Sequence, residues 1–268
     1  MLSLESSGWL HSGMSRIPAS LQAFLSHLID YAGLYPPANL PLDDVVENYR
    51  CFLISPESWI LNRLVLPASK LAELDLEEHW RITLLVDSDP GPLPRQIESL
   101  ETKLPRKFSL PTYCEAPLEQ ISDSYAKLRT GGITPEAIPS AGEVAAFLCA
   151  AAARRLPFKA TAGLHHAIRS LEPLTNEPNA PNAMMHGFLN FFAAAAFAWQ
   201  GMALDSVFAV LTEQDPAVFR FHEDELRWRA SGISTAEMEA ARRYFAHSFG
   251  SCSFQEPIAD LRELGLLP

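Results

Sequence analysis

Two short apolar segments that each carry a lysine, with a helical pattern between them, constrain the fold of this chain most. The first contains Lys127 and runs into the Arg-Thr-Gly-Gly loop at 129–132, and the second, Phe158–Thr161, contains Lys159. The alanine-rich pattern at 141–155 lies between them and has helical spacing. This order predicts two parallel strands joined by a crossover helix, because parallel strands need a long connection.

Further short apolar segments repeat this alternation of strands and helical patterns along the chain. We predict strands that start at Arg63, Trp80, Phe108, Ala126, Phe158 and Val207. The segments 29–31 and 217–228 are further candidates for strands. Strands that alternate with helices form a largely parallel sheet, and eight such units close into a (β/α)8 barrel of the TIM type. We therefore predict an α/β fold of this type, with an N-terminal helical extension over residues 17–29.

Helical patterns account for much of the remaining chain. Helical spacing predicts a helix after Pro41, a short helix at 69–74 and a docking helix from Gln255. The apolar run 187–199 is shorter than the roughly 20 residues that span a bilayer, so it predicts a buried helix. Alternating aromatic and polar residues at 219–228 are typical of an edge hairpin.

Length and composition favour one large domain. The chain has 268 residues, of which 48% are hydrophobic, and this is enough for a sizeable core. We assign residues 15–268 to a single α/β barrel domain. Residues 1–14 lack the basic start and apolar core of a signal peptide, and Met14 is an alternative initiator. We expect residues 1–14 to be a disordered extension.

Charge and cysteine content limit the classes of partner and the cellular compartment that we expect. A net charge of −11 argues against a nucleic-acid or anionic-membrane partner, because either needs a basic face. The four cysteines are widely separated, which fits a reducing, cytoplasmic location. The chain has no glycine-rich loop for dinucleotides or nucleoside triphosphates. We predict no cofactor and a small-molecule substrate, and a homo-oligomer stays open.

Lys159 is the leading candidate for a catalytic residue. It lies in an apolar-led strand, where an inward-facing amine loses hydration, and a second cation at Lys127 or Arg129 lowers the pKa of such an amine further. A neutral lysine amine is a nucleophile near pH 7 and forms Schiff bases with carbonyl compounds. The alternative is a strand-end lysine whose stem is buried and whose charge is solvated.

Loop residues beside the two lysines are candidates for binding an anion. Arg129 can hold a carboxylate or phosphate with two hydrogen bonds, and the Thr-Gly-Gly segment at 130–132 can form a small backbone nest. The Gly- and Ser-rich segment 248–253 has the same capacity. Asp30 is either an active-site acid on the first strand or part of a turn that ends a helix.

His165, His166 and His186 form a second group of candidates. Neutral imidazoles near a carboxylate can hold Zn²⁺ or Fe²⁺, and Glu115 and Asp87 are available carboxylates. The i, i+4 spacing that strengthens a metal assignment is absent. We therefore favour histidines that bond to backbone or act in acid–base chemistry, and predict no metal.

Three segments, in the same order, resemble the class I aldolases of the deoxyribose-phosphate aldolase type. They are Leu28-Ile-Asp-Tyr-Ala-Gly-Leu-Tyr-Pro-Pro37, Lys127-Leu-Arg-Thr-Gly-Gly132 and Phe158-Lys-Ala-Thr-Ala-Gly163. The resemblance implies a TIM barrel in which Lys159 forms the Schiff base, and it favours Asp30 as an active-site acid. The chain departs from that family after residue 163, where the Lys-Pro-Ala-Gly-Gly-like motif is missing and His165 and His166 follow instead.

The leading hypothesis is a lyase or aldolase-like enzyme that forms a Schiff base with a small anionic carbonyl compound. Lys159 would form the imine, Lys127 would lower its pKa, and His165 or His166 would move protons. The catalytic set also includes Asp30. The predicted substrate contacts are Arg129, Thr130, Gly131, Gly132, Thr161, Glu115, His186 and Asn190.

Two alternatives stay open at this point. One is a metal-dependent hydrolase or isomerase that uses His165, His166 and His186 with Glu115 at the barrel mouth. The other is a non-catalytic, barrel-derived binding protein, which a mouth closed by the Tyr-Pro-Pro segment at 35–37 would favour. The same segment is a candidate for a lid or a dimer contact.

Overall fold

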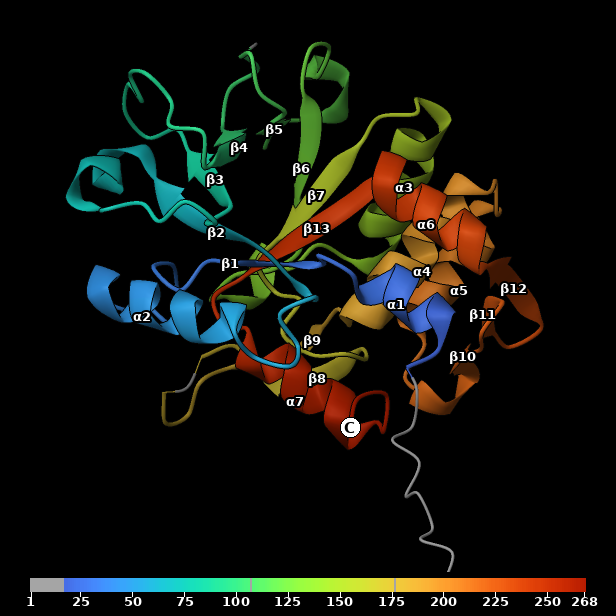
Figure 1. Ribbon diagram of the computed structural model, residues 1–268. Helices are drawn as coiled ribbons and strands as arrows, with labels where there is room; N and C mark the ends of the chain where they lie inside the picture. Colours follow the sequence, from blue (N-terminus) through green and yellow to red (C-terminus); the bar gives the residue numbers. More distant parts are fainter. Residues whose placement is uncertain (1–16, 107, 176) are drawn as a thin grey trace, which may run out of the picture.

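Eight parallel strands close into a barrel in the computed structural model, which describes residues 17–106, 108–175 and 177–268 (Figure 1). Around the barrel the strand order is β1-β13-β7-β6-β5-β4-β3-β2, and β2 closes on β1. The strands are β1 (Ile29–Tyr31), β2 (Leu61–Pro67), β3 (Ile82–Leu85), β4 (Ile97–Thr102), β5 (Thr112–Cys114), β6 (Tyr125–Arg129), β7 (Phe158–Thr161) and β13 (Ala246–Ser251). The predicted α/β barrel of the TIM type is confirmed.

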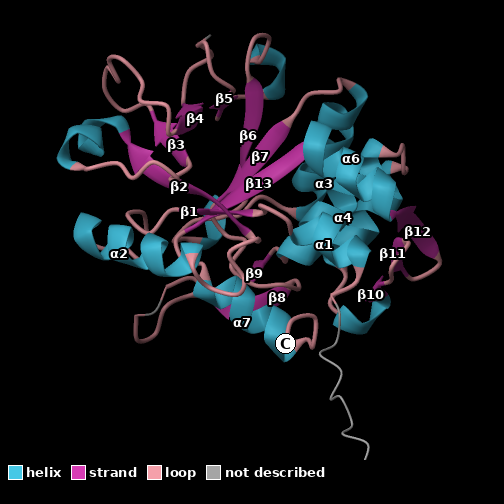
Figure 2. Cartoon of the chain, viewed as in Figure 1, coloured by secondary structure: helices cyan, strands magenta, loops and turns pink. Residues whose placement is uncertain are grey.

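The helices around the barrel are unevenly distributed (Figure 2). Helix α2 (Leu42–Leu53) joins β1 to β2, and α3 (Ala141–Ala153), preceded by the short η3 (Pro135–Ala137), joins β6 to β7. The helical elements between β2 and β6 in the described part of the chain are only the short 3-10 helices η1 (Ala68–Glu73) and η2 (Leu118–Gln120). The helical layer is therefore thickest beside β6, β7 and β13.

The connection from β7 to β13 is long and carries most of that layer. Its elements are β8 (Ser170–Pro173), β9 (Asn182–Met185), α4 (Phe188–Trp199), α5 (Leu204–Thr212), η4 (Pro216–Val218), β10 (Phe219–Phe221), β11 (Glu225–Trp228), β12 (Ser231–Ser234) and α6 (Thr235–Tyr244). Helix α1 (Ala19–Leu25) precedes β1, and α7 (Gln255–Glu263) follows β13. The predicted N-terminal and C-terminal helices are therefore present.

Local sequence explains where several of these helices begin. Helices α3 and α6 each start with a capping box, in which a serine accepts from the third helical residue and a glutamate side chain accepts in return. Helix α4 is apolar on all sides and is buried along nearly its whole length. As predicted, it is a core helix.

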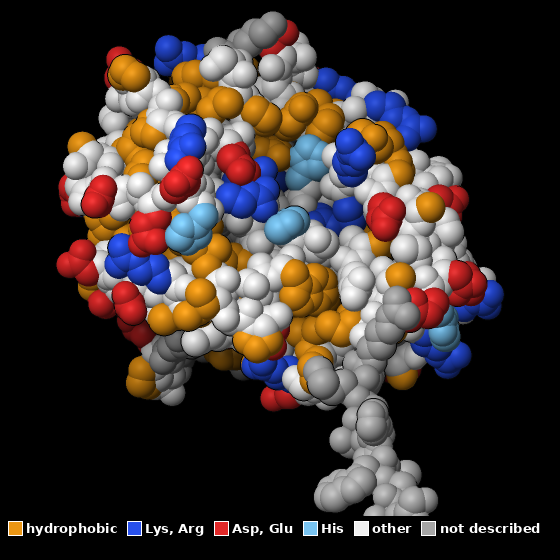
Figure 3. All heavy atoms as spheres, viewed as in Figure 1, with side chains coloured by type: hydrophobic (Ala, Val, Ile, Leu, Met, Phe, Trp, Pro, Cys, Tyr) orange, Lys and Arg blue, Asp and Glu red, His pale blue; other side chains and the backbone are white. Residues whose placement is uncertain are grey.

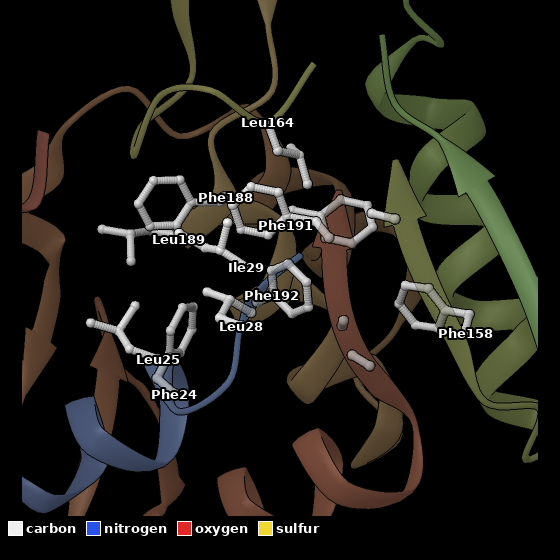
Figure 4. Close-up of a cluster of buried hydrophobic side chains, with 14 of the residues drawn as sticks. Phe24, Leu25, Leu28, Ile29, Phe158, Leu164, Phe188, Leu189, Phe191 and Phe192 are labelled. Atoms are coloured by element: carbon white, nitrogen blue, oxygen red, sulfur yellow. The ribbon is translucent and has the colours of Figure 1, made fainter. Parts of the chain in front are cut away.

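The apolar core lies between the outside of the barrel and the helices. Phe188 and Phe192 of α4 pack on Phe249 of β13, with ring centroids 5.7 and 5.9 Å apart, and Phe192 also meets Phe24 of α1. Figure 4 shows Phe24, Phe188 and Phe192 in the space between α1, α4 and the strands. Aromatic packing of this kind fixes the helices on one side of the barrel.

Several sequence predictions about the strands were wrong. The segment from Val207 is part of α5, because its short apolar run is compatible with either structure and here packs on α3 and α4. The segment 217–228 lies outside the barrel, in the antiparallel sheet β10-β11-β12, although its predicted hairpin is confirmed. Strands β4 and β13 were not predicted. The predicted extension at residues 1–14 lies outside the described residues.

One segment among the described residues, Pro135–Ala153, is long and apolar enough to cross a membrane by length and composition. It consists of η3 and α3, and α3 packs on α4 and α5 in the helical layer of the barrel. A core helix of a soluble protein passes the same test. This packing is that of a helix in the outer layer of a (β/α)8 barrel.

Candidate functional site

The interior of the barrel holds charged residues where TIM barrels usually carry branched apolar side chains. Asp30, Glu101, Lys127 and Lys159, from four different strands, have exposed fractions between 0% and 8%. Buried charges are costly unless they are paired and hydrogen-bonded, and replacing them with apolar residues is often neutral or stabilising. Buried ion pairs are therefore weak evidence for a purely stabilising role, and we take this cluster as the candidate site.

Lys159 lies at the centre of the cluster and is fully buried. Its Nζ donates to Oδ2 of Asp30 and to Oε1 of Glu101, the latter at 2.5 Å, and lies 5.7 Å from the ring centre of Tyr113. Burial alone would lower the pKa of this amine, but the two carboxylates raise it above its ordinary value. The predicted lowering of the Lys159 pKa by Lys127 is therefore wrong.

Asp30 of β1 is held by four donors. Its Oδ1 accepts from Asn62 at 2.7 Å and from the backbone N–H of Arg63 at 3.2 Å. Its Oδ2 accepts from Ser248 of β13 at 2.7 Å and from Lys159. Both lone-pair sites of each oxygen are thus occupied, which fixes the carboxylate against the lysine. The interior position fits an active-site acid better than a helix-ending turn.

A chain of alternating charges leads from Lys159 to the rim of the barrel. Lys127 Nζ lies 2.7 Å from Oε2 of Glu101 and 3.1 Å from Oε2 of Glu115, and Arg129 Nε donates to Glu115 at 2.8 Å. The exposed side-chain fraction rises from 5% at Glu101 to 22% at Glu115 and 47% at Arg129. The chain therefore connects the buried amine to solvent at the carboxyl ends of β5 and β6.

The two glutamates in this series of alternating charges are ionised. Burial alone would raise the pKa of Glu101, but Lys127 and Lys159 lower it to about 2. Burial acts in the same direction on Glu115, whose pKa is nevertheless lowered by Arg129 and Lys127. Each carboxylate is shared between two cations, so Lys127 acts on Lys159 through the carboxylate of Glu101.

The predicted Thr-Gly-Gly loop packs against the loop after β7. The hydroxyl of Thr130 donates to the carbonyl oxygens of Thr161 and Ala162. A Cβ on Gly131 would lie 2.6 Å from Cα of Gly163, so the two loops meet backbone to backbone. These contacts give Thr130 and Gly131 a structural role. Gly132 lies beside a cavity at the same end of the barrel.

That cavity has a volume of about 300 Å³ and contains two of the predicted histidines. Nδ1 of His165 lies 3.0 Å from Glu256, and Nδ1 of His166 lies 3.3 Å from Asp260. The hydrogen bond to Asp260 raises the pKa of His166. The remaining lining comes from the loops after β1, β6, β7 and β13, from the β8–β9 hairpin and from α7, and includes Pro36, Pro37, Gly163, Glu172 and Cys252. Lys159 does not line this cavity.

The structure places the other two predicted contact residues in backbone hydrogen bonds. Nε2 of His186 lies 2.8 Å from the carbonyl oxygen of Pro139, and burial lowers the pKa of this histidine. The amide of Asn190 donates to the carbonyl oxygens of Val210 and Glu213 and accepts from the backbone of Arg169. Both side chains tie the helical layer together, away from the charged cluster.

The predicted metal alternative requires the three histidines to converge with Glu115. Over residues 17–106, 108–175 and 177–268, no group of three or more His, Cys, Asp or Glu side chains is arranged to hold a metal ion. His165 and His166 bond to carboxylates of α7, whereas Glu115 bonds to Lys127 and Arg129. The structure therefore separates the proposed ligands.

Sequence reasoning missed Glu101 of the cluster and two side chains that donate to Asp30, namely Asn62 and Ser248. Glu101 belongs to Ile97-Glu-Ser-Leu-Glu-Thr102, whose acids and serine hide a strand pattern. Ser248 falls in a segment interpreted as a glycine-rich loop, although it lies on β13. The apolar residues of this segment, Ile97 and Leu100, lie three positions apart, so it lacks the alternation that signals a strand.

The sequence matches no protein-family model, no curated protein and no solved structure. The fold and the charged cluster define a TIM-type barrel with an ionised interior. The comparisons give no support to the aldolase resemblance, so any activity rests on the geometry of the site.

Proposed function

We propose that this protein is an enzyme that forms a Schiff base between Lys159 and a small anionic carbonyl compound, with lyase or aldolase-like chemistry. One observation carries the proposal: the amine of Lys159 lies inside the barrel and is shared between Asp30 and Glu101. These three residues come from β1, β4 and β7, so the arrangement depends on barrel closure.

Asp30 supplies the proton transfers that imine formation needs, and Glu101, whose pKa is lowered to about 2, holds the amine in place. The ammonium group passes one proton to Asp30, and the free amine attacks the carbonyl carbon to give a carbinolamine. The carboxylic acid then returns that proton to the carbinolamine hydroxyl, which leaves as water, and a protonated imine remains. Both carboxylates already lie within hydrogen-bond distance of Nζ. The raised pKa of Lys159 means that the amine is free only after this transfer.

The positive charges toward the rim are the reason that we propose an anionic substrate. Arg129 is the most exposed cation in this series of charges, and it can hold a carboxylate or phosphate with two hydrogen bonds. A substrate anion there would compete with Glu115 for Arg129 and Lys127. His165 and His166 lie on the cavity at the same end, where they would exchange protons with solvent.

A second candidate function is a non-catalytic, barrel-derived binding protein. The observation that favours it is the low exposure of the site: the side chains of Lys159 and Asp30 are each 1% exposed. The hydroxyl of Tyr35 is also buried without a hydrogen-bond partner among the described residues. Burial raises the pKa of Tyr35, and the negative charge of Glu101 raises it further. Under this hypothesis the amine never meets a carbonyl compound.

Borohydride trapping separates the two functions. The purified protein is incubated with small aldehydes, 2-keto acids and phosphorylated aldehydes, reduced, and analysed by intact mass and peptide mapping. We expect one adduct, at Lys159, that is lost in Lys159→Met and retained in the matched variant Lys70→Met, since Lys70 is an exposed lysine whose one ion-pair partner among the described residues is Glu73. Adducts confined to exposed lysines, or none with any carbonyl, would refute the imine chemistry.

A further inference from the structure

A second and larger cavity, of about 960 Å³, opens at the opposite end of the barrel, where the strands begin. Its walls come from α1 and α6 and from the starts of β2, β5, β6 and β13. Figure 3 shows basic and histidine side chains gathered around a hollow on the face that carries α1 and α6. The chemistry of TIM barrels takes place at the other end, so this cavity opens away from the proposed imine site, although Asn62 of its wall hydrogen-bonds to Asp30 and Tyr113 lies beside Lys159.

The lining is basic, although the whole chain carries a net charge of −11. Four arginines line the cavity, namely Arg63, Arg81, Arg242 and Arg243, and Glu239 is the one carboxylate of the lining. Arg63 and Arg81 form ion pairs with the same carboxylate, Glu98, at 2.9 and 3.0 Å, and Glu98 does not line the cavity. The cavity therefore carries excess positive charge, which low-dielectric walls concentrate.

Arg242 adds a buried positive charge to this wall, while its five donors are all taken by backbone carbonyls. It is 9% exposed, and its guanidinium donates only to backbone carbonyls, including those of Phe24 at 3.0 Å and Ser26 at 3.1 Å. No carboxylate of the described residues lies within ion-pair distance of it, and burial lowers its pKa to about 9. A buried cation without a counter-charge is costly, and a bound anion would offset that cost.

The rest of the wall is aromatic. Tyr113, Tyr125 and His247 pack edge to face with centroids 5.5 to 5.9 Å apart, and Tyr113 hydrogen-bonds to Nδ1 of His247 at 2.7 Å. Burial, together with Arg242 and Arg63, lowers the pKa of His247 to about 4, so this ring is neutral at pH 7. A neutral aromatic wall facing arginines suits a flat ring that carries anionic groups.

We infer that this cavity binds a small phosphorylated molecule with an aromatic ring, whose phosphates lie against Arg81 and Arg243. Guanidinium groups recognise phosphate oxygens in pairs. The volume lies within the range of small-molecule sites in proteins. Arg243 is exposed and forms no ion pair with the described carboxylates, so its donors are free for such a ligand.

Calorimetric titration of the full chain with three probes tests the inference. ADP carries both the ring and the phosphates, pyrophosphate carries only the charge, and adenosine carries only the ring. We expect ADP to bind most tightly, pyrophosphate more weakly and adenosine not at all, with affinity falling as salt is added. Absence of heat from both ADP and pyrophosphate at millimolar concentration would overturn the inference.

Four single variants locate the binding. We expect Arg81→Gln and Arg243→Gln each to weaken ADP about tenfold, and Glu239→Gln to strengthen it severalfold because a repulsive charge is lost. Arg220→Gln is the matched control, since Arg220 is an exposed arginine that does not line the cavity. Equal affinities in all four variants would place the anion elsewhere and overturn the inference. Circular dichroism confirms that each variant is folded.

Discussion

Replacement of Lys159 by methionine tests whether the interior charges are energetically coupled. Methionine keeps an unbranched, apolar stem of similar length and removes the ammonium group. Lys159 is the one cation of the described residues within ion-pair distance of Asp30, whereas Glu101 also contacts Lys127. The substitution therefore leaves the buried charge of Asp30 with only the neutral donors described above, including Ser248.

The structure sets the size of the expected effect. Removal of one partner from a buried ion pair costs about 3–5 kcal/mol, because the other charge stays desolvated. We expect a loss of this size from Lys159→Met, out of a typical domain stability of about 5–15 kcal/mol. Asp30→Asn in the same chain removes the stranded charge, and Lys127 still compensates Glu101. The double variant Lys159→Met/Asp30→Asn should recover about 2 kcal/mol or more.

Urea unfolding at pH 7, followed by circular dichroism, measures all four corners of this double-mutant cycle. We expect the two substitutions to be strongly non-additive, with the double variant more stable than Lys159→Met alone. Additive losses, or a loss below about 1 kcal/mol in Lys159→Met, would refute the buried ion pair. If the single variant does not fold, the double variant serves as the control for borohydride trapping.

Two further predictions address the loops and the opposite end of the barrel. Gly131→Ala should cost about 1–3 kcal/mol in thermal melts, because its Cβ would lie 2.6 Å from Cα of Gly163. Gly142→Ala is the matched control and should cost nothing, since its nearest neighbour would be 3.9 Å away; equal effects would contradict this account of the loop contact. His247 keeps a pKa of about 4 in the folded state against 6.5 unfolded, so its contribution to stability is present above pH 6.5 and is lost as pH falls toward 4. His247→Gln should flatten urea-unfolding stability across that window, and an unchanged pH slope would show that His247 does not titrate in this way.

The fold could be predicted in outline because parallel strands and crossover helices leave local patterns. The strand Phe158–Thr161 and the helix from Ala141 follow from apolar runs, helical spacing and alanine content. The segment at 207–211 could not be assigned, because a short apolar run fits a helix or a strand until its neighbours are known. Strand β4 was hidden by its polar residues, of which Ser99 bonds to Thr83 and Glu101 to Lys159 inside the protein.

The candidate site, like the fold, could be predicted from the sequence only in part. The sequence by itself determined that Lys127 and Lys159 lie on adjacent strands with Asp30 near the start of the barrel, because strand spacing is a local property. Only the tertiary structure decided that Asp30 and Glu101 hold the amine of Lys159 and raise its pKa. A pKa depends on burial and on charges brought within a few ångströms. Barrel closure joins Lys159 to carboxylates 129 and 58 residues away, and no local pattern records that distance.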